Sequence, residues 1–252
     1  MHSGETTEGV VLPRPAHWGF CGTVVWGVVI GILFIIVQAV TIALVVYSST
    51  EHISGSDFEQ LFASSANNGH FLSFATLATA AAGCGAIAGI IKLKRGSLLK
   101  EYLGLELAPA RTLLKWIGLA ALFVVSSDSL TLALGRRIVP EFMSSVYASA
   151  NPAWMIWLAL VVAAPLFEET FFRGFLFKGF ESSFMGPTGA VLVTAGLWAM
   201  VHVQYNGYEM AIIFCLGLLL GGARRATGSL SVPLALHAAV NFVATIETAL
   251  FG

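Results

Sequence analysis

Two adjacent carboxylates and an arginine interrupt the apolar stretch PLFEETFFRGFLF, residues 165–177. Glu169 and Arg173 are four residues apart with the acid first, which favours an ion pair on one helix face. Glu168 lies about 100° around the helix from its neighbour, so it faces something else. The spacing predicts one supporting carboxylate, Glu169, and one reactive carboxylate, Glu168. The alternative is that both acids belong to a packing network.

Two later apolar segments repeat polar side chains at four-residue spacing. WAMVH places Trp198 and His202 on one helix face, and HAAVN does the same for His237 and Asn241. A charge at the bilayer centre costs about 2.5–3.5 kcal/mol, so intramembrane polar groups face a partner or a water-filled cavity. We expect these groups to converge with the glutamates around one cavity. A lone intramembrane histidine, however, is often only a hydrogen-bonded core residue.

This set of side chains supports hydrolysis of an acyl bond by two routes. In a low-dielectric cavity a carboxylate can take a proton from water, while histidine and asparagine donate to an oxyanion. Alternatively, Glu168, His202 and His237 could ligate zinc and leave one position open for water. Neither HExxH spacing nor a GxSxG context occurs. Both routes stay open, and we favour the metal-free one because the amide of Asn241 suits oxyanion donation better than metal ligation.

The elements that position these residues belong in a membrane. Of the 252 residues, 57% are hydrophobic and only 11% are charged, with a mean hydropathy of +0.82. Ordinary soluble domains carry about 25% charged residues. The net charge of −1 suggests no nucleic-acid partner. The three cysteines lie in apolar runs without zinc-ligand spacing, so we expect buried thiols and no disulfide framework.

The pattern predicts an all-α integral membrane protein, a bundle of about seven transmembrane helices around an intramembrane polar cavity. The expected spans are residues 22–47, 71–91, 112–134, 153–178, 187–205, 209–223 and 231–250. Residues 1–100 would form a two-helix region with a polar tail and an acidic loop, and residues 101–252 a catalytic core. Most lysines and arginines fall in segments on the same side of the membrane as the N-terminus. This bias predicts a cytoplasmic N-terminus and an external C-terminus.

Two further features of the spans are expected to be structural. Asp128 is an intramembrane acid that we expect neighbouring serines, Arg136 or Arg137 to satisfy, although it could also line the cavity. Three GxxxG spacings occur, the last at Gly217 and Gly221, and we expect them to allow close helix packing.

The three motifs together resemble the CAAX-protease and bacteriocin-processing (CPBP) family of intramembrane endopeptidases, also called the ABI or type II CAAX prenyl endopeptidase family. EETFFR resembles its EExxxR motif, and HAAVN its HxxxN motif. WAMVH resembles FxxxH, with Trp198 in place of the phenylalanine. The resemblance covers residues 100–252, and YLGLE, which begins at Tyr102, resembles the segment that often precedes this core. The resemblance implies that Glu169 and Arg173 are the supporting pair of the first motif.

The resemblance also implies catalytic roles. Glu168 would activate water with His202 assisting, while His237 and Asn241 would stabilise the oxyanion or hold the water. The family is described as metalloproteases, and a metal-free, glutamate-dependent mechanism is also argued for it. A zinc ion bound by Glu168, His202 and His237 therefore stays an open cofactor.

The expected function is intramembrane cleavage of a membrane-associated peptide or protein. Eukaryotic relatives trim prenylated C-terminal tripeptides, and bacterial members are linked to bacteriocin maturation or immunity. The alternatives are a non-catalytic scaffold or immunity protein of the same fold, and a proton or solute transporter. Intact motif residues favour the enzyme, and no internal repeat supports a transporter. We expect a multi-pass protein of a bacterial inner (plasma) membrane whose partners are its substrate and the bilayer.

Overall fold

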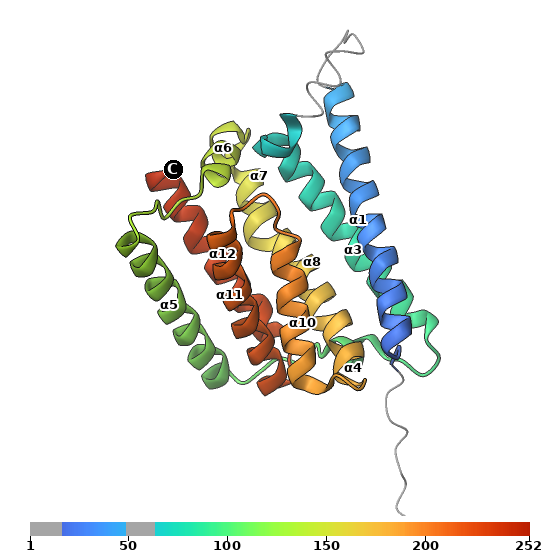
Figure 1. Cartoon of the computed structure of the whole chain (residues 1–252). Coiled ribbons are helices and arrows are strands. Elements are labelled where there is room, and N and C mark those ends of the chain that lie inside the picture. Colours follow the sequence, from blue (N-terminus) through green and yellow to red (C-terminus); the bar gives the residue numbers. More distant parts are fainter. Residues whose placement is uncertain (1–16, 49–63) are drawn as a thin grey trace, which may run out of the picture.

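The computed structural model describes residues 17–48 and 64–252, and within these ranges the regular elements are helices (Figure 1). The expected all-α membrane architecture is confirmed. The polar tail before residue 17 and residues 49–63 of the predicted acidic loop lie outside the described residues. The helices are α1 (Phe20–Ser48), a 3-10 turn (Ser65–Asn67), α3 (Gly69–Leu93), α4 (Leu99–Leu103), α5 (Ala110–Ala133), α6 (Glu141–Ser149), a long helix over residues 153–181, α10 (Gly186–Met200), α11 (Gly207–Thr227) and α12 (Ser231–Phe251).

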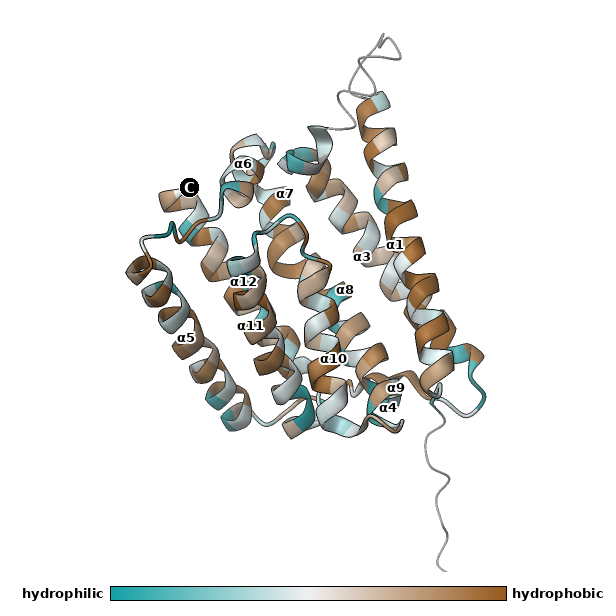
Figure 2. Cartoon of the chain, in the orientation of Figure 1, coloured by the Kyte–Doolittle hydropathy of each residue, from teal (hydrophilic) through white to brown (hydrophobic). Residues whose placement is uncertain are grey.

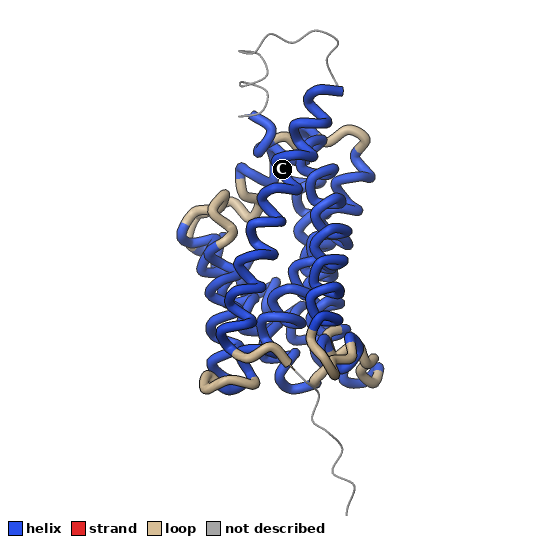
Figure 3. The backbone as a smooth tube through the Cα atoms, turned by 90° about the vertical axis from the view of Figure 1, so that its right-hand side faces the viewer, coloured by secondary structure: helices blue, strands red, loops and turns tan. Residues whose placement is uncertain are grey.

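Six helices in the described ranges are long and apolar enough to cross a membrane: α1, α3, α5, the helix over residues 153–181, α11 and α12. Figure 2 shows hydrophobic residues along their length, and in Figure 3 the loops gather at the two ends of the bundle. The predicted span 187–205 is observed as the shorter helix α10. Its 15 residues reach about 22 Å, against a hydrocarbon core of about 30 Å.

Local hydrogen bonds separate α10 from α11 soon after Met200. The Nδ1 atom of His202 lies 2.6 Å from the carbonyl oxygen of Trp198. Asn206 then caps α11, because its side chain accepts from the Glu209 N–H while the Glu209 carboxylate accepts from the Asn206 N–H. His202 therefore lies in the connection between α10 and α11. This connection follows a helix that is too short to cross the bilayer.

The long helix over residues 153–181 is wound irregularly at two places. It consists of α7 (Ala153–Leu158), a π-helical segment (Ala159–Ala163), α8 (Ala164–Glu168), a second π-helical segment (Glu169–Leu176) and α9 (Phe177–Glu181). A π-helix pairs the carbonyl of residue i with the N–H of residue i+5. Residue 165 is proline, which has no N–H, so the Leu160 carbonyl lacks that partner. It accepts instead from Asn241 Nδ2 on α12, at 2.8 Å.

Glycines bring α11 close to α10, as the last of the three GxxxG spacings predicts, whereas an added Cβ atom at Gly31, Gly85 or Gly89 would have nothing within 4 Å. A Cβ atom at Gly217 would lie 3.0 Å from the Ala195 side chain and 3.2 Å from the Trp198 ring. One at Gly221 would lie 3.1 Å from Val191. The face of α11 that lacks side chains therefore packs directly on α10 and leaves room for the indole of Trp198.

The YLGLE segment joins α4 to the connection between α11 and α12. Gly104 ends α4 in the left-handed region, with φ +68°, and its carbonyl accepts from the Leu230 N–H at 2.8 Å. The ring of Tyr102 stacks on Phe175, with centroids 5.8 Å apart. Burial raises the pKa of Tyr102 to about 12, so its hydroxyl stays protonated at neutral pH. The predicted domain boundary after residue 100 falls inside α4.

Replacing Gly104 by alanine should destabilise the protein. A Cβ atom there would collide with the Arg224 guanidinium and the Gly228 carbonyl, and the left-handed backbone costs an L-residue about 1–2 kcal/mol. We expect the Gly104→Ala protein to melt several degrees below the native protein in detergent. Gly118→Ala is the matched control, because Gly118 lies within α5 with nothing within 4 Å of the added Cβ. Equal melting temperatures for the two variants would contradict this role of Gly104.

Candidate active site

Glu169 is fully buried and lies at the centre of a charged cluster. Its Oε1 atom is 2.8 Å from Arg173 Nη1, and both side chains are 0% exposed. The predicted i,i+4 ion pair is therefore confirmed. The same oxygen is 2.8 Å from His237 Nδ1 on α12. Because an ionised carboxylate only accepts hydrogen bonds, Nδ1 is the donor in this contact, and His237 turns its Nε2 atom elsewhere.

Arg173 links the glutamate helix to α10 and α11. Its Nη2 atom donates to the Gly217 carbonyl at 3.3 Å, and its guanidinium lies over the Trp198 ring, 4.5 Å from the centroid. The backbone carbonyl of Arg173 accepts from Arg224 Nε at 2.9 Å. Arg173 therefore connects three helices, and its positive charge is buried.

Arg224 is a structural residue that the sequence analysis missed. It directly follows the predicted span 209–223, but it is buried at the end of α11, while Arg225 is exposed and binds the Thr188 hydroxyl. A signal was available, because Arg224 falls at helical spacing after Gly217 and Gly221 and so shares their inward face. Its guanidinium also donates to the Gly228 carbonyl.

Glu168 is in a different environment from its neighbour. Its side chain is 22% exposed, and its Oε2 atom lies 4.0 Å from His237 Nε2. The same oxygen accepts from the indole Nε1 of Trp198 at 2.5 Å. The structure therefore has one enclosed, ion-paired carboxylate and one carboxylate with partial access to its surroundings.

His202 and Asn241 join the cluster less directly. The His202 ring packs edge-on against the Trp198 indole, with centroids 5.2 Å apart, and its Nδ1 atom is bonded to the Trp198 carbonyl. Asn241 follows His237 by one turn and donates an amide hydrogen to Leu160. An amide nitrogen has a second hydrogen to donate. Glu168, His237 and Trp198 are thus in direct proximity, and His202 reaches them through the indole.

The candidate zinc ligands do not form a metal site in this arrangement. Within residues 17–48 and 64–252, no group of three or more histidine, cysteine, aspartate or glutamate side chains is placed to hold a metal ion. The Glu168 oxygen nearest His237 lies 4.0 Å from His237 Nε2 and accepts the indole N–H of Trp198. The set Glu168, His202 and His237 therefore does not fit zinc here, and we derive no step through a metal.

Asp128 has a partner that the sequence analysis missed. Asp128 on α5 lies beside Glu247 on α12, close enough for the two carboxyl groups to interact. Arg136 instead lies over the Tyr208 ring, 4.7 Å from its centroid. We did not include Glu247 among the intramembrane polar residues, and spacing along one helix cannot reveal a contact between two helices.

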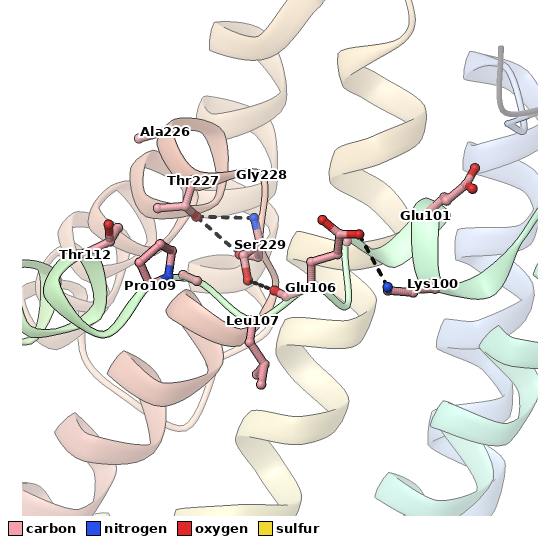
Figure 4. Close-up of a pocket in the computed structure, with 12 residues that line it drawn as sticks. Lys100, Glu101, Glu106, Leu107, Pro109, Thr112, Ala226, Thr227, Gly228 and Ser229 are labelled. Atoms are coloured by element: carbon pink, nitrogen blue, oxygen red, sulfur yellow. Dashed lines mark hydrogen bonds and ion pairs between the residues drawn. The ribbon is translucent and has the colours of Figure 1, made fainter. Parts of the chain in front are cut away.

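A pocket of about 650 Å³ lies away from this cluster, between the YLGLE segment and the ends of α5 and α11 (Figure 4). An ion pair of 3.4 Å between Lys100 and Glu106 lies at its edge. The Ser229 hydroxyl donates to the Glu106 carbonyl and so holds the pocket wall to the α11–α12 connection. None of the candidate site residues lines this pocket.

Comparison with known proteins agrees with the motifs. Residues 150–243 match the family model described as "Type II CAAX prenyl endopeptidase Rce1-like", which confirms the resemblance over that segment. A protein of Escherichia coli named "Uncharacterized 24.3 kDa protein" is 33% identical over 125 residues, which are 48% of this chain and 57% of that protein. The match thus spans little more than half of this relative. No solved structure gives a significant match. The YLGLE segment lies outside the matched residues.

Proposed function

We propose that this chain is an intramembrane endopeptidase in which Glu168 activates water to hydrolyse a peptide bond of a membrane-associated peptide or protein. The observation that carries the proposal is the difference between the two adjacent carboxylates. Glu169 is 0% exposed and bound by Arg173 and His237, whereas Glu168 is 22% exposed. The match to a membrane protease family over residues 150–243 supports the same reaction class.

In this mechanism the Glu168 carboxylate takes a proton from water while the water oxygen attacks the carbonyl carbon. The carbonyl oxygen becomes an oxyanion. Glu168 then gives the proton to the peptide nitrogen, the C–N bond breaks, and an acid and an amine leave. The same carboxylate serves as base and then as acid, so it returns to its starting state.

The remaining cluster residues hold and polarise the reacting groups. Glu169 orients His237 through Nδ1, so His237 Nε2 faces the Glu168 side and can hold the water or, when protonated, donate to the oxyanion. His202 assists with its Nε2 atom, because its Nδ1 is bonded to the Trp198 carbonyl. Asn241 contributes its second amide hydrogen to the oxyanion.

The substrate class and the orientation are part of the proposal. The apolar helices around the cluster favour a peptide that enters from the bilayer or its surface, with or without a prenyl group. Lysines and arginines are in surplus on the side of the membrane that holds the N-terminus, which supports a cytoplasmic N-terminus. We place the chain in a bacterial plasma membrane.

The proposed function can be tested with the purified chain in lipid vesicles. The chain would be incubated with a library of prenylated and unmodified peptides in ¹⁸O-labelled water, and the products analysed by mass spectrometry. Hydrolysis should give two fragments, with one labelled oxygen in the new carboxylate. A folded chain that cleaves no peptide would argue for the scaffold alternative.

A strong zinc chelator should leave this activity unchanged. The reason is the position of the donors: Trp198 donates to the Glu168 oxygen beside His237, and the candidate ligands are not gathered around one point. Rates would be compared before and after chelation and after zinc is added back. Loss of activity with the chelator and recovery with zinc would contradict the metal-free mechanism.

A further inference from the structure

Trp198 occupies the motif position where the family pattern has phenylalanine, and the indole makes a contact that phenylalanine cannot make. Its Nε1–H donates to Glu168 Oε2 at 2.5 Å. The side chain is 2% exposed, so little water competes for this hydrogen bond. An N–H donor stabilises a carboxylate in its ionised form. The substitution therefore adds a hydrogen bond to the group that we propose as the base.

The indole ring is held on several sides. The Arg173 guanidinium lies 4.5 Å from the ring centroid, a cation–π distance. The rings of His237 and His202 pack edge-on at 5.1 and 5.2 Å. On α11, the missing side chain of Gly217 provides the space for the indole. A ring restrained in this way can fix the direction of its N–H.

We propose that Trp198 is a positioning residue that holds one oxygen of Glu168 and leaves the other to meet the water. This inference rests on the proposed function. The indole has a single N–H and no acceptor, so it binds one carboxylate oxygen and does not compete for the proton that the carboxylate takes. The orientation of the Glu168 carboxylate therefore depends on Trp198 of α10 as well as on the helix that carries Glu168.

The Trp198→Phe variant restores the residue of the family pattern and removes the N–H donor together with the five-membered part of the indole ring. Other charged and titratable groups around Glu168 stay in place: Glu169 and Arg173 on its own helix, His237 on α12, and His202 and Tyr205 after α10. Without the donor the carboxylate can turn away from the orientation that activates water. We therefore expect kcat to fall by about tenfold while KM stays unchanged.

The first measurement determines kcat and KM separately for the native chain and Trp198→Phe. Trp157→Phe is the matched control, because it also loses an indole hydrogen bond, at 3.4 Å to the Tyr147 hydroxyl, which is not a carboxylate. Only Trp198→Phe should lower kcat at unchanged KM. A kcat of Trp198→Phe equal to that of the native chain and of Trp157→Phe would overturn the inference.

A second measurement needs no substrate. In NMR spectra of the ¹⁵N-tryptophan-labelled chain, the Trp198 indole resonance is the one that Trp198→Phe removes. It should move to higher field in Glu168→Gln, because an amide oxygen is a weaker acceptor than a carboxylate. An unshifted resonance would overturn the inference whatever the chain cleaves. A shifted resonance without any cleavage by the native chain would establish the hydrogen bond and overturn the proposed function.

Discussion

The Glu168→Gln protein is expected to fold and melt like the native chain and to have lost its peptidase activity. Glutamine keeps the shape of glutamate and can still accept the Trp198 N–H through its amide oxygen. It cannot take a proton from water. Loss of a general base lowers the rate by roughly 10²–10⁴-fold, so turnover should fall to background. Cleavage rates and melting temperatures of the same purified samples test this prediction.

Glu169→Gln is the matched control, since it changes the adjacent carboxylate in the same way. Glu169 accepts from Arg173 and His237 in a fully buried site, so this variant leaves an arginine without its anion. We therefore expect a clear loss of thermal stability, in contrast to Glu168→Gln. If Glu168→Gln retained native turnover, the assigned reactive carboxylate would be wrong.

Arg173→Ala should destabilise the protein by about 3–5 kcal/mol, the cost of breaking a buried ion pair by removing one partner. The substitution leaves Glu169 buried without its cation. It also removes the hydrogen bond to the Gly217 carbonyl and the cation–π contact with Trp198. The expected result is low membrane yield, together with a melting temperature far below that of the native chain.

Two companion variants separate charge from packing. Arg225→Ala removes an exposed arginine from the same end of the bundle and should change stability by less than about 0.5 kcal/mol. In the double variant Arg173→Ala, Glu169→Gln, no buried charge is left unpaired, so part of the lost stability should return. An Arg173→Ala protein with native yield and melting temperature would show that the ion pair is not structural.

Local spacing was sufficient to predict the ion pair between Glu169 and Arg173. Glu169 and Arg173 lie on one helix, and their i,i+4 contact follows from its geometry. Hydropathy also predicted the helices, because apolar runs of this length need a bilayer or a large core. The separation of Glu168 from Glu169 was visible for the same reason, since adjacent residues point in different directions.

Contacts between helices could not be predicted in this way. The bond from Trp198 to Glu168 joins residues on two helices, and helical periodicity gives no register between them. The bond from Asn241 to Leu160 depends on a π-helical segment before Pro165, which hydropathy does not detect. The proximity of Asp128 to Glu247 was missed for the same reason.

The depth of His202 in the bilayer could not be predicted correctly from the sequence. A full span over residues 187–205 would place His202 near the far side of the bilayer from the start of α10. The observed helix ends at Met200, and the Trp198 ring contacts both Glu168 and His202. The short helix therefore brings the second motif to the level of the first.

The most direct test of the account is a comparison of membrane peptides from cells that contain the native chain or Glu168→Gln at equal levels. Mass spectrometry of the membrane fraction would identify peptides with new termini. The account predicts fragments cut within or beside membrane segments that are present with the native chain and absent with Glu168→Gln. Identical fragments in both samples, with both proteins folded in the membrane, would contradict the claim that Glu168 activates water for peptide hydrolysis.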